Sequence, residues 1–268
     1  MAKKSIGIVG CGAIGQAVMR AADTGVLDVE VAGVVSRTES TARDFLSTLN
    51  DPRPYLSLGE LIEASDMVVE AAGQQVVPSL AKATFDAGKE LMLISVGALI
   101  AHPEIMARSR ETRCRLLMPS GAIVGLDGIK SASMGAIDYI TMTSRKGPAS
   151  LDGAPHVVDN AIDLWGMSEE TEIFSGTARE ACVGFPANLN VSAAVSFAGV
   201  GPDLTTVKMV AVPGLTRNCH DIEVEGEFGL LKIHLENIPS ENPKTGKLTA
   251  MSIIRTLQQA VDPVHLGT

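Results

Sequence analysis

The sequence is poor in aromatic residues, in cysteine pairs and in positive charge. Aromatic side chains make up only 3% of the 268 residues, which argues against a row of rings on which nucleic-acid bases would stack. The four cysteines form no C-x-x-C pair and no cluster with metal-ligand spacing, so we expect free thiols and no metal site. Lys and Arg number 22 against 31 Asp and Glu, for a net charge of −9. This balance argues against nucleic acid and against an anionic membrane surface as partners.

Long apolar runs are also missing. The longest ones contain glycines and charges and fall short of a membrane span. The first strand pattern begins within a few residues of Met1, so we expect no secretory signal peptide and a cytoplasmic location. Hydrophobic residues nevertheless make up 46% of the chain. We therefore expect one large or two modest globular domains with an aliphatic core.

The clearest motif is a glycine-rich turn near the start. An apolar run at residues 6–9 leads into Gly10-x-Gly12-x-x-Gly15, and residues 16–22 have a helical pattern. In a dinucleotide-binding turn the first glycine permits the tight turn, the second admits the pyrophosphate, and the third lets helix and strand pack closely. The amides at the helix start, around Ala13 and Ile14, then face the phosphates. A second strand pattern at residues 29–35 follows at βαβ distance, which favours a dinucleotide site over a glycine-rich turn without a ligand.

The end of that second strand indicates which dinucleotide binds. NAD sites usually have Asp or Glu there, to bind the ribose 2′-hydroxyl. This chain has Ser36, Arg37 and Thr38 instead. An arginine can pair with a 2′-phosphate, and the two hydroxyls can donate to it. The sequence therefore favours NADP, with NAD still open, although Arg37 could also be only a solvated surface residue.

Strand and helix patterns alternate through the first 120 residues. Further apolar strands are expected at 66–73, 91–98 and 115–119, with helices at 39–49, 56–64, 77–88 and 102–111. This alternation predicts a Rossmann-type, doubly wound parallel sheet over residues 1–120. The strand at 66–73 ends in Ala72 and Gly73, whose small side chains leave room for a cofactor at the carboxyl end of the sheet.

The pattern changes after Pro119. Residues 120–128 are glycine-rich, and later strands at 139–143, 205–212, 220–226 and 229–236 alternate with period two. Helical patterns cover residues 157–165 and 188–198, and the last two strands read as a hairpin. We predict a second, α+β domain over residues 121–245 on a mostly antiparallel sheet. A C-terminal segment, 246–268, contains a helix at 248–261 that we expect to pack back on the first domain.

His220 is the histidine most suited to catalysis. It starts a strand whose same-face residues are Ile222 and Val224, so its ring points to the covered side of the sheet. Histidine is the usual proton-transfer group near neutral pH. On spacing alone a core histidine is the favoured explanation of this position, and other residues must decide whether His220 is catalytic.

Two further groups could contact a substrate. Asn188 and Asn190 lie at the entrance to an apolar helix, where one can cap the helix and the other is spare for a polar ligand. Cations of the second half that could hold carboxylates are Lys208, Arg217, Lys244 and Lys247. Each of these could also be a solvated surface charge.

Taken together, these segments resemble the L-aspartate dehydrogenases over nearly the whole chain. The resemblance is carried by the glycine turn and by four later segments: Pro119-Ser120-Gly121-Ala122-Ile123-x-Gly125-x-Asp127, Phe185-Pro186-Ala187-Asn188-x-Asn190-Val191, Asn218-x-His220-x-Ile222-x-x-x-Gly226 and Asn242-Pro243-Lys244-Thr245 with Leu248-Thr249-Ala250. The glycine turn is common to dinucleotide enzymes, whereas the later four together are specific.

The resemblance implies an active-site residue at His220 and nicotinamide-binding positions at Ala122 and Asn190. Lys244 and Thr245, with Asn188, become candidates for binding the substrate. It further implies a cytoplasmic homodimer, with a catalytic and dimerisation role for the second domain, and a link to aspartate and to the NAD precursor iminosuccinate.

The sequence thus predicts NAD(P)-dependent oxidative deamination of L-aspartate to iminosuccinate, then oxaloacetate and ammonia, or the reverse. Two alternatives remain at this point. One is another two-domain reductase, resembling homoserine dehydrogenase or dihydrodipicolinate reductase, although the paired-histidine and lysine motif of the latter is missing around His220. The other is a non-catalytic NADP-binding regulator.

Overall fold

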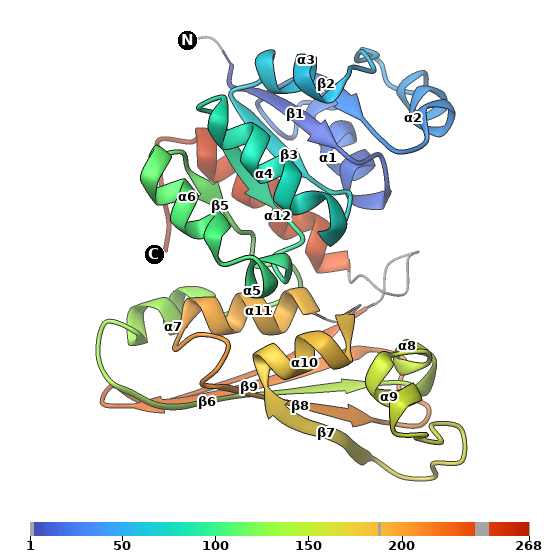
Figure 1. Ribbon diagram of the computed structural model, residues 1–268, viewed down its shortest axis with the longest axis vertical. Helices are drawn as coiled ribbons and strands as arrows, with labels where there is room; N and C mark the ends of the chain where they lie inside the picture. Colours follow the sequence, from blue (N-terminus) through green and yellow to red (C-terminus); the bar gives the residue numbers. More distant parts are fainter. Residues whose placement is uncertain (1–2, 187–188, 239–246, 268) are drawn as a thin grey trace. The chain divides into compact units, whose positions relative to one another are not determined.

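A computed structural model describes residues 3–186, 189–238 and 247–267. The chain forms two compact units (Figure 1). Unit 1 contains Met1–Pro119 and Ala250–His265, and unit 2 contains Ser120–Thr249 and Leu266–Thr268.

Unit 1 is built on a five-stranded sheet in the order β2-β1-β3-β4-β5, with every neighbouring pair parallel. Its strands are β1 (Ser5–Val9), β2 (Glu30–Val35), β3 (Met67–Glu70), β4 (Glu90–Leu93) and β5 (Leu116–Leu117). Continuous apolar runs form these strands because both faces of a parallel sheet are covered. The predicted Rossmann-type fold is confirmed.

Helices connect the strands of unit 1, and one further helix, from the end of the chain, packs with them (Figure 1). They are α1 (Ala13–Asp23), α2 (Glu39–Leu46), α3 (Leu58–Glu63), the 3₁₀ turn η1 (Gln74–Val76), α4 (Val77–Asp86), α5 (Ala98–Ala101), α6 (Glu104–Thr112) and α12 (Lys247–Val261). Local chemistry sets some of their ends. At α3, the Ser57 side chain accepts from the Glu60 amide while the Glu60 carboxylate accepts from the Ser57 amide, a capping box that fixes the first turn.

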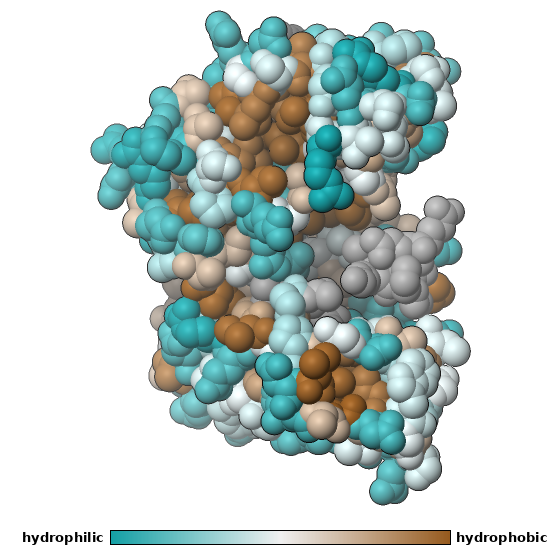
Figure 2. Space-filling model, turned by 45° about the vertical axis from the view of Figure 1, so that its right-hand side comes forward, coloured by the Kyte–Doolittle hydropathy of each residue, from teal (hydrophilic) through white to brown (hydrophobic). Residues whose placement is uncertain are grey.

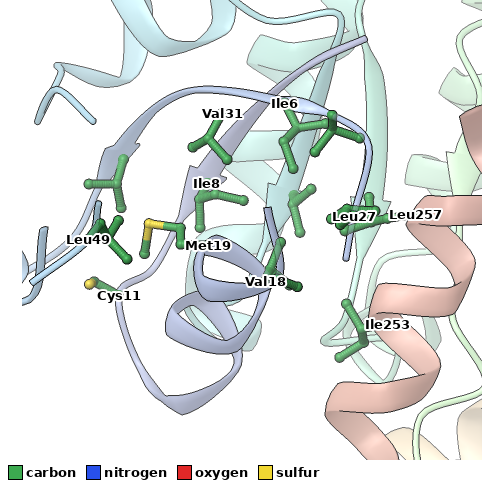
Figure 3. Close-up of a cluster of buried hydrophobic side chains, with 14 of the residues drawn as sticks. Ile6, Ile8, Cys11, Val18, Met19, Leu27, Val31, Leu49, Ile253 and Leu257 are labelled. Atoms are coloured by element: carbon green, nitrogen blue, oxygen red, sulfur yellow. The ribbon is translucent and has the colours of Figure 1, made fainter. Parts of the chain in front are cut away.

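The main core of unit 1 joins residues from both ends of the sequence (Figure 3). Ile6 and Ile8 of β1 pack with Val18 of α1 and with Ile253 and Leu257 of α12. Complete burial of one such side chain contributes roughly 1.5–3 kcal/mol. The C-terminal helix is therefore part of the core of unit 1.

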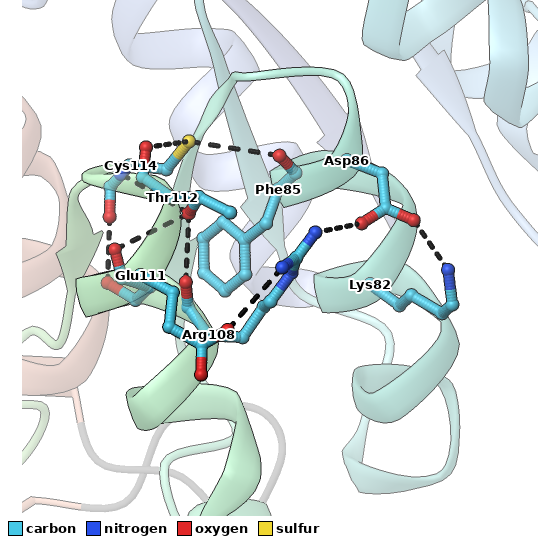
Figure 4. Close-up of polar contacts among 8 residues, drawn as sticks. Lys82, Phe85, Asp86, Arg108, Glu111, Thr112 and Cys114 are labelled. Atoms are coloured by element: carbon cyan, nitrogen blue, oxygen red, sulfur yellow. Dashed lines mark hydrogen bonds and ion pairs between the residues drawn. The ribbon is translucent and has the colours of Figure 1, made fainter.

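On the surface of unit 1, charged side chains link α4 to α6 (Figure 4). Asp86 accepts from Lys82 one turn earlier in α4 and from Arg108 of α6, at 2.5 and 3.0 Å. Arg108 also lies 3.4 Å from Glu111. These pairs are exposed, so solvent and salt weaken them, and packing of the helices matters more.

Unit 2 has a mixed five-stranded sheet in the order β10-β9-β6-β8-β7. Only the β6–β8 pair is parallel, and the other three pairs are antiparallel. The strands are β6 (Ile137–Lys146), β7 (Thr171–Thr177), β8 (Thr205–Ala211), β9 (Asn218–Gly226) and β10 (Gly229–Asn237). The predicted hairpin is present, with Gly226 opposite Gly229. The mostly antiparallel second sheet is likewise confirmed.

Helices cover one face of this sheet (Figure 1). They are α7 (Leu126–Ala132), α8 (Pro148–Leu151), α9 (Pro155–Asp159), α10 (Ala178–Gly184) and α11 (Leu189–Ala198). Ile140 and Met142 of β6 pack with Val195 of α11 and Ile222 of β9. Alternate residues of β6 and β9 therefore point to this covered face.

Several predicted boundaries were wrong. The helix predicted at 157–165 is only α9, because Ala161 has a positive φ of 51° that a continuing helix cannot contain. The strand predicted at 91–98 ends at Leu93 and is followed by α5. The glycine-rich stretch at 120–128 contains the start of α7, and β7 and α10 were not predicted. A capping box between Thr177 and Glu180 starts α10, and its T-x-x-E spacing was visible in the sequence.

Polar side chains cover much of the visible face of each unit, and apolar side chains gather there in patches (Figure 2). Scattered exposed apolar residues are normal for a folded protein. Within the described ranges, no helix combines the length and the hydrophobicity that crossing a membrane requires.

Candidate active site

The glycine turn of unit 1 has the geometry that its sequence pattern predicts. Gly10 has a φ of 107°, and a Cβ there would lie 2.4 Å from the Ala71 carbonyl oxygen. A Cβ at Gly15 would lie 2.0 Å from the Gly10 oxygen, so only glycine lets α1 pack against the turn. At Gly12, by contrast, a Cβ would meet no atom within 4 Å. The space beside Gly12 is open, and a side chain would fill it.

The start of α1 offers hydrogen-bond donors beside this space. The Gln16 amide donates to the Gly12 oxygen at 2.9 Å and closes the first turn of the helix. The preceding amides of Ala13, Ile14 and Gly15 have no acceptor within the helix. Such amides, with the positive end of the helix dipole, bind phosphate. The turn therefore fits the diphosphate of a dinucleotide.

The end of β2 carries no carboxylate. Tyr55 Oη donates to the Ser36 carbonyl oxygen at 2.7 Å and fixes the backbone there. Arg37 is exposed, and Thr38 begins α2 without a capping hydrogen bond from its side chain. These three residues are thus contiguous at the carboxyl edge of the sheet, where they could contact a 2′-phosphate.

Glu70 organises the neighbouring loops. It is the last residue of β3 and is fully buried. Its Oε1 accepts from the Ala72 and Gly73 amides at 2.8 and 2.7 Å, and its Oε2 accepts from the Ser95 amide at 2.8 Å. One carboxylate therefore fixes the loops after β3 and β4, including Ala72 and Gly73. Sequence reasoning missed Glu70, although a charged residue inside an apolar strand was a visible signal.

In unit 2, His220 is buried and paired with a serine. His220 of β9 and Ser144 of β6 are direct register partners, and Ser144 Oγ lies 3.0 Å from His220 Nδ1. Burial, together with the nearby charge of Lys146, lowers the pKa of His220 to about 3. The ring is therefore neutral at pH 7.

His220 belongs to a buried polar cluster on the covered face of the sheet. We define the polar cluster as five buried residues at one end of β6, β9 and β10: Ser144, Lys146, Asn218, His220 and Asn237. The register brings them together, since Ser144 lies opposite His220 and Asn218 lies opposite Asn237. The other buried covered-face residues of β6 and β9, Ile140, Met142, Ile222 and Val224, are apolar, so the cluster marks a candidate site.

Sequence reasoning missed Lys146. The predicted strand stopped at residue 143, whereas β6 continues to Lys146. Continuing the alternation from Met142 through Ser144 would have placed Lys146 on the covered face. The expected cations Lys208 and Arg217 instead lie in surface ion pairs with Glu172 and Glu236.

Of the two predicted nicotinamide-binding positions in unit 2, Ala122 contacts the polar cluster. Asn237 Nδ2 donates to the Ala122 carbonyl oxygen at 2.8 Å, which ties the 120–125 loop to it. Asn190 is in the first turn of α11 and is exposed. A Cβ at Gly199, just after α11, would lie 2.2 Å from Ile140 Cδ1, so α11 runs opposite to β6 (Figure 1). Asn190 is therefore at the end of the sheet that carries His220.

Three candidate residues, Asn188, Lys244 and Thr245, lie outside the described residues. Elsewhere in the chain, within the ranges that the structure describes, no group of three His, Cys, Asp or Glu side chains could hold a metal ion. The described candidates for binding and chemistry are the glycine turn and the polar cluster.

Comparisons with known proteins point to one family. A family model described as "Aspartate dehydrogenase, C-terminal" matches residues 127–260, and one described as "Homoserine dehydrogenase, NAD binding domain" matches residues 10–119. An L-aspartate dehydrogenase of Methanosarcina mazei is 44% identical over 268 residues, which cover 98% of this chain and 99% of that protein. L-aspartate dehydrogenase 3 of Bordetella bronchiseptica is 41% identical, with coverage of 98% and 97%.

A solved structure shows the same fold. The crystal structure of aspartate dehydrogenase from Thermotoga maritima has a TM-score of 0.76 at 22% sequence identity, and the match covers 100% of both chains. The full-length relatives and the family model of the C-terminal part name the same family, and the solved structure shares the fold. The chain therefore belongs to the L-aspartate dehydrogenase family.

Proposed function

We propose that this protein is an NAD(P)-dependent L-aspartate dehydrogenase. It oxidises the Cα–N bond of L-aspartate to give iminosuccinate, which water converts to oxaloacetate and ammonia, and it also runs the reverse reductive amination. The single observation that carries the proposal is the buried, neutral His220 beside Ser144, in the part of the chain that matches the C-terminal family model. Neither the other two-domain reductases nor a non-catalytic regulator is favoured by the full-length relatives, which are named L-aspartate dehydrogenases.

Unit 1 would bind the adenosine and diphosphate parts of the cofactor. The amides of Ala13, Ile14 and Gly15 would donate to the diphosphate beside the open space at Gly12. Arg37, with Ser36 and Thr38, would hold a 2′-phosphate, so NADP is favoured over NAD. When bound, the nicotinamide supplies the hydride acceptor or donor. The small residues Ala72 and Gly73, whose loop Glu70 fixes, would leave room for the nicotinamide.

Unit 2 would supply the proton chemistry. Ser144 occupies Nδ1 of His220, which leaves Nε2 for proton transfer. A neutral imidazole can take a proton from the substrate ammonium group or from the water that attacks iminosuccinate, and return it in the reverse direction. Ala122 and Asn190 correspond, by the family resemblance, to nicotinamide-binding positions. Asn237 would position Ala122 through its carbonyl oxygen.

We further propose that the protein works as a cytoplasmic homodimer and that its product can serve as a precursor of NAD. These points are supported by the family resemblance. The sheet of unit 2 adds one observation: its described helices cover a single face. On the other face, partly exposed ion pairs join β6, β9 and β10, and no described helix covers that face, against which a second copy would pack.

An absorbance assay at the nicotinamide band tests the activity. Purified protein with oxaloacetate, ammonia and NADPH should consume the reduced cofactor, and L-aspartate with NADP should produce it. The rate with L-aspartate should greatly exceed the rate with alanine. Alanine lacks the second carboxylate, so it would leave polar groups of the site unpaired. Comparable rates with alanine or homoserine would contradict the aspartate assignment. Cofactor binding without turnover of any of these compounds would support a regulator instead.

A further inference from the structure

Lys146 is a buried cation without a partner among the described residues. It ends β6 on the covered face of the sheet, with only 6% of its surface exposed. Within the described ranges it forms no ion pair, and burial is the sole influence on its pKa. Other cations of unit 2 differ, since Arg145 pairs with Glu170, and Lys232 pairs with Glu223.

An unpaired buried ammonium group is unfavourable for folding. Taking a charge out of water without a counter-charge is costly, and a lysine responds by losing its proton more easily. Burial lowers the pKa of Lys146 to about 8, so the charged form still predominates at pH 7. The fold therefore keeps a positive charge in a largely buried position, where nothing in the described structure neutralises it. A bound anion would supply the missing counter-charge.

The surroundings of Lys146 indicate what kind of anion fits. Lys146 and Ser144 are successive covered-face residues of β6, and Ser144 is bonded to His220. The charge of Lys146 acts directly on His220. The amide of Asn218 lies one position further along the covered face of β9. A cation, a neutral acid/base and an amide are thus assembled within one cluster, which suits a carboxylate attached to a reacting carbon.

We propose that Lys146 binds a carboxylate group of the dicarboxylic substrate, next to the proton-transfer residue His220. This inference rests on the proposed aspartate dehydrogenase activity and deepens it, because it names the substrate-binding cation. Lys146 and a carboxylate form a charge-assisted hydrogen bond in a water-poor setting, where such bonds are strong. Binding of the substrate carboxylate would neutralise the positive charge of Lys146.

The kinetic test compares Lys146→Met and Lys146→Gln with Lys232→Met, an exposed lysine on the same sheet as a matched control. Loss of one charge-assisted hydrogen bond should raise the KM for oxaloacetate about 10- to 100-fold. NADPH affinity should stay unchanged in both variants, and the control should behave as the wild type. An unchanged KM in an active enzyme would overturn the role of Lys146.

A binding test separates this inference from the proposed function. Malonate, an unreactive dicarboxylate, should raise the unfolding temperature of the wild type and of Lys232→Met but not of the Lys146 variants. Without ligand, Lys146→Met should unfold at a higher temperature than the wild type, because a buried charge is removed. If the wild type binds malonate through Lys146 but turns over no aspartate, the site stands and the proposed activity fails. If Lys146→Met is destabilised and still binds malonate like the wild type, Lys146 is structural and the inference is wrong.

Discussion

Ser144 Oγ lies 3.0 Å from His220 Nδ1, and the two residues face each other across the antiparallel strands β6 and β9. The contact is buried, so water cannot replace it. It holds the imidazole ring in one orientation and defines which nitrogen remains available.

Ser144→Ala should lower kcat without unfolding the protein. The variant removes one hydrogen bond to the imidazole, a net loss of about 0.5–1.5 kcal/mol, so kcat should fall by up to roughly tenfold. Thr143→Ala is the matched control, because Thr143 is the neighbouring residue on the opposite face. A wild-type kcat in Ser144→Ala, at wild-type stability, would remove the positioning role of Ser144.

His220→Asn should reduce turnover far more. Asparagine keeps a hydrogen-bonding side chain but cannot transfer a proton near neutral pH, so kcat should fall by about 10²–10⁴. NADPH binding and the unfolding temperature should change little. His234→Asn serves as control, because His234 is an exposed histidine that contacts Asp221 at 2.6 Å. If the unfolding temperature collapses while turnover per folded molecule survives, His220 is structural.

Arg37→Ala should weaken the binding of NADPH but not that of NADH. Loss of a charge-assisted pair with a 2′-phosphate should weaken NADPH binding by about 1–3 kcal/mol and leave NADH binding nearly unchanged. Titration of both cofactors measures this, with Arg110→Ala, an exposed arginine of α6, as control. Equal losses for NADPH and NADH would show that Arg37 does not read the 2′-phosphate.

Glu70→Gln should destabilise unit 1 and weaken cofactor binding together. The neutral amide replaces a carboxylate that accepts from three backbone amides, and its NH₂ group must face one of these donors. We expect a loss of about 2–4 kcal/mol in the free energy of unfolding. Denaturant unfolding with and without NADPH measures both effects, and Glu63→Gln on the exposed side of α3 is the control. An unchanged affinity for NADPH would show that Glu70 contributes to folding stability alone.

Acid should destabilise the protein through His220. Its pKa falls from 6.5 in the unfolded chain to about 3 in the folded protein. Between these values only the unfolded chain takes up the proton, so stability falls as the pH falls, by at most about 1.4 kcal/mol per pH unit. His220→Asn should flatten the dependence of the free energy of unfolding between pH 4 and 6.5. Hydrogen bonds with Asp221 and Glu236 raise the pKa of His234, so protonation of His234 stabilises the folded protein as the pH falls. His234→Asn should therefore leave the dependence of stability on pH between 4 and 6.5 unchanged or make it steeper.

The parts of the fold that depend on local sequence were predictable. The roles of Gly10, Gly12 and Gly15 follow from a motif of only six residues, and the structure gives each glycine the geometry that the motif requires. The alternation of strands and helices in the first part, and the hairpin at Gly226–Gly229, were equally local signals. Fold class and family could therefore be predicted correctly.

The parts that depend on register between distant strands were not predictable. The contact between Asn237 and Ala122 joins positions 115 residues apart. The alternation of β6 could place Lys146 on the covered face, but its burial also depends on β8 and β9 lying on either side of β6, and periodicity in one strand does not give its partners. Predicting the role of Glu70 required knowledge of which two loops contact its carboxylate. The roles of Arg37 and His220 stay predictions that the variants above test.

The polar cluster also has a consequence for how the enzyme becomes active during synthesis and refolding. Its members come from β6, β9 and β10, so none of the three segments alone contains the site. Such non-local pairings form slowly compared with helices and local turns. Recovery of turnover after dilution from denaturant should consequently lag behind recovery of helical circular dichroism. A chain truncated before β10 would lack Asn237 and the anchor for Ala122, and its specific activity would report incomplete assembly of the sheet.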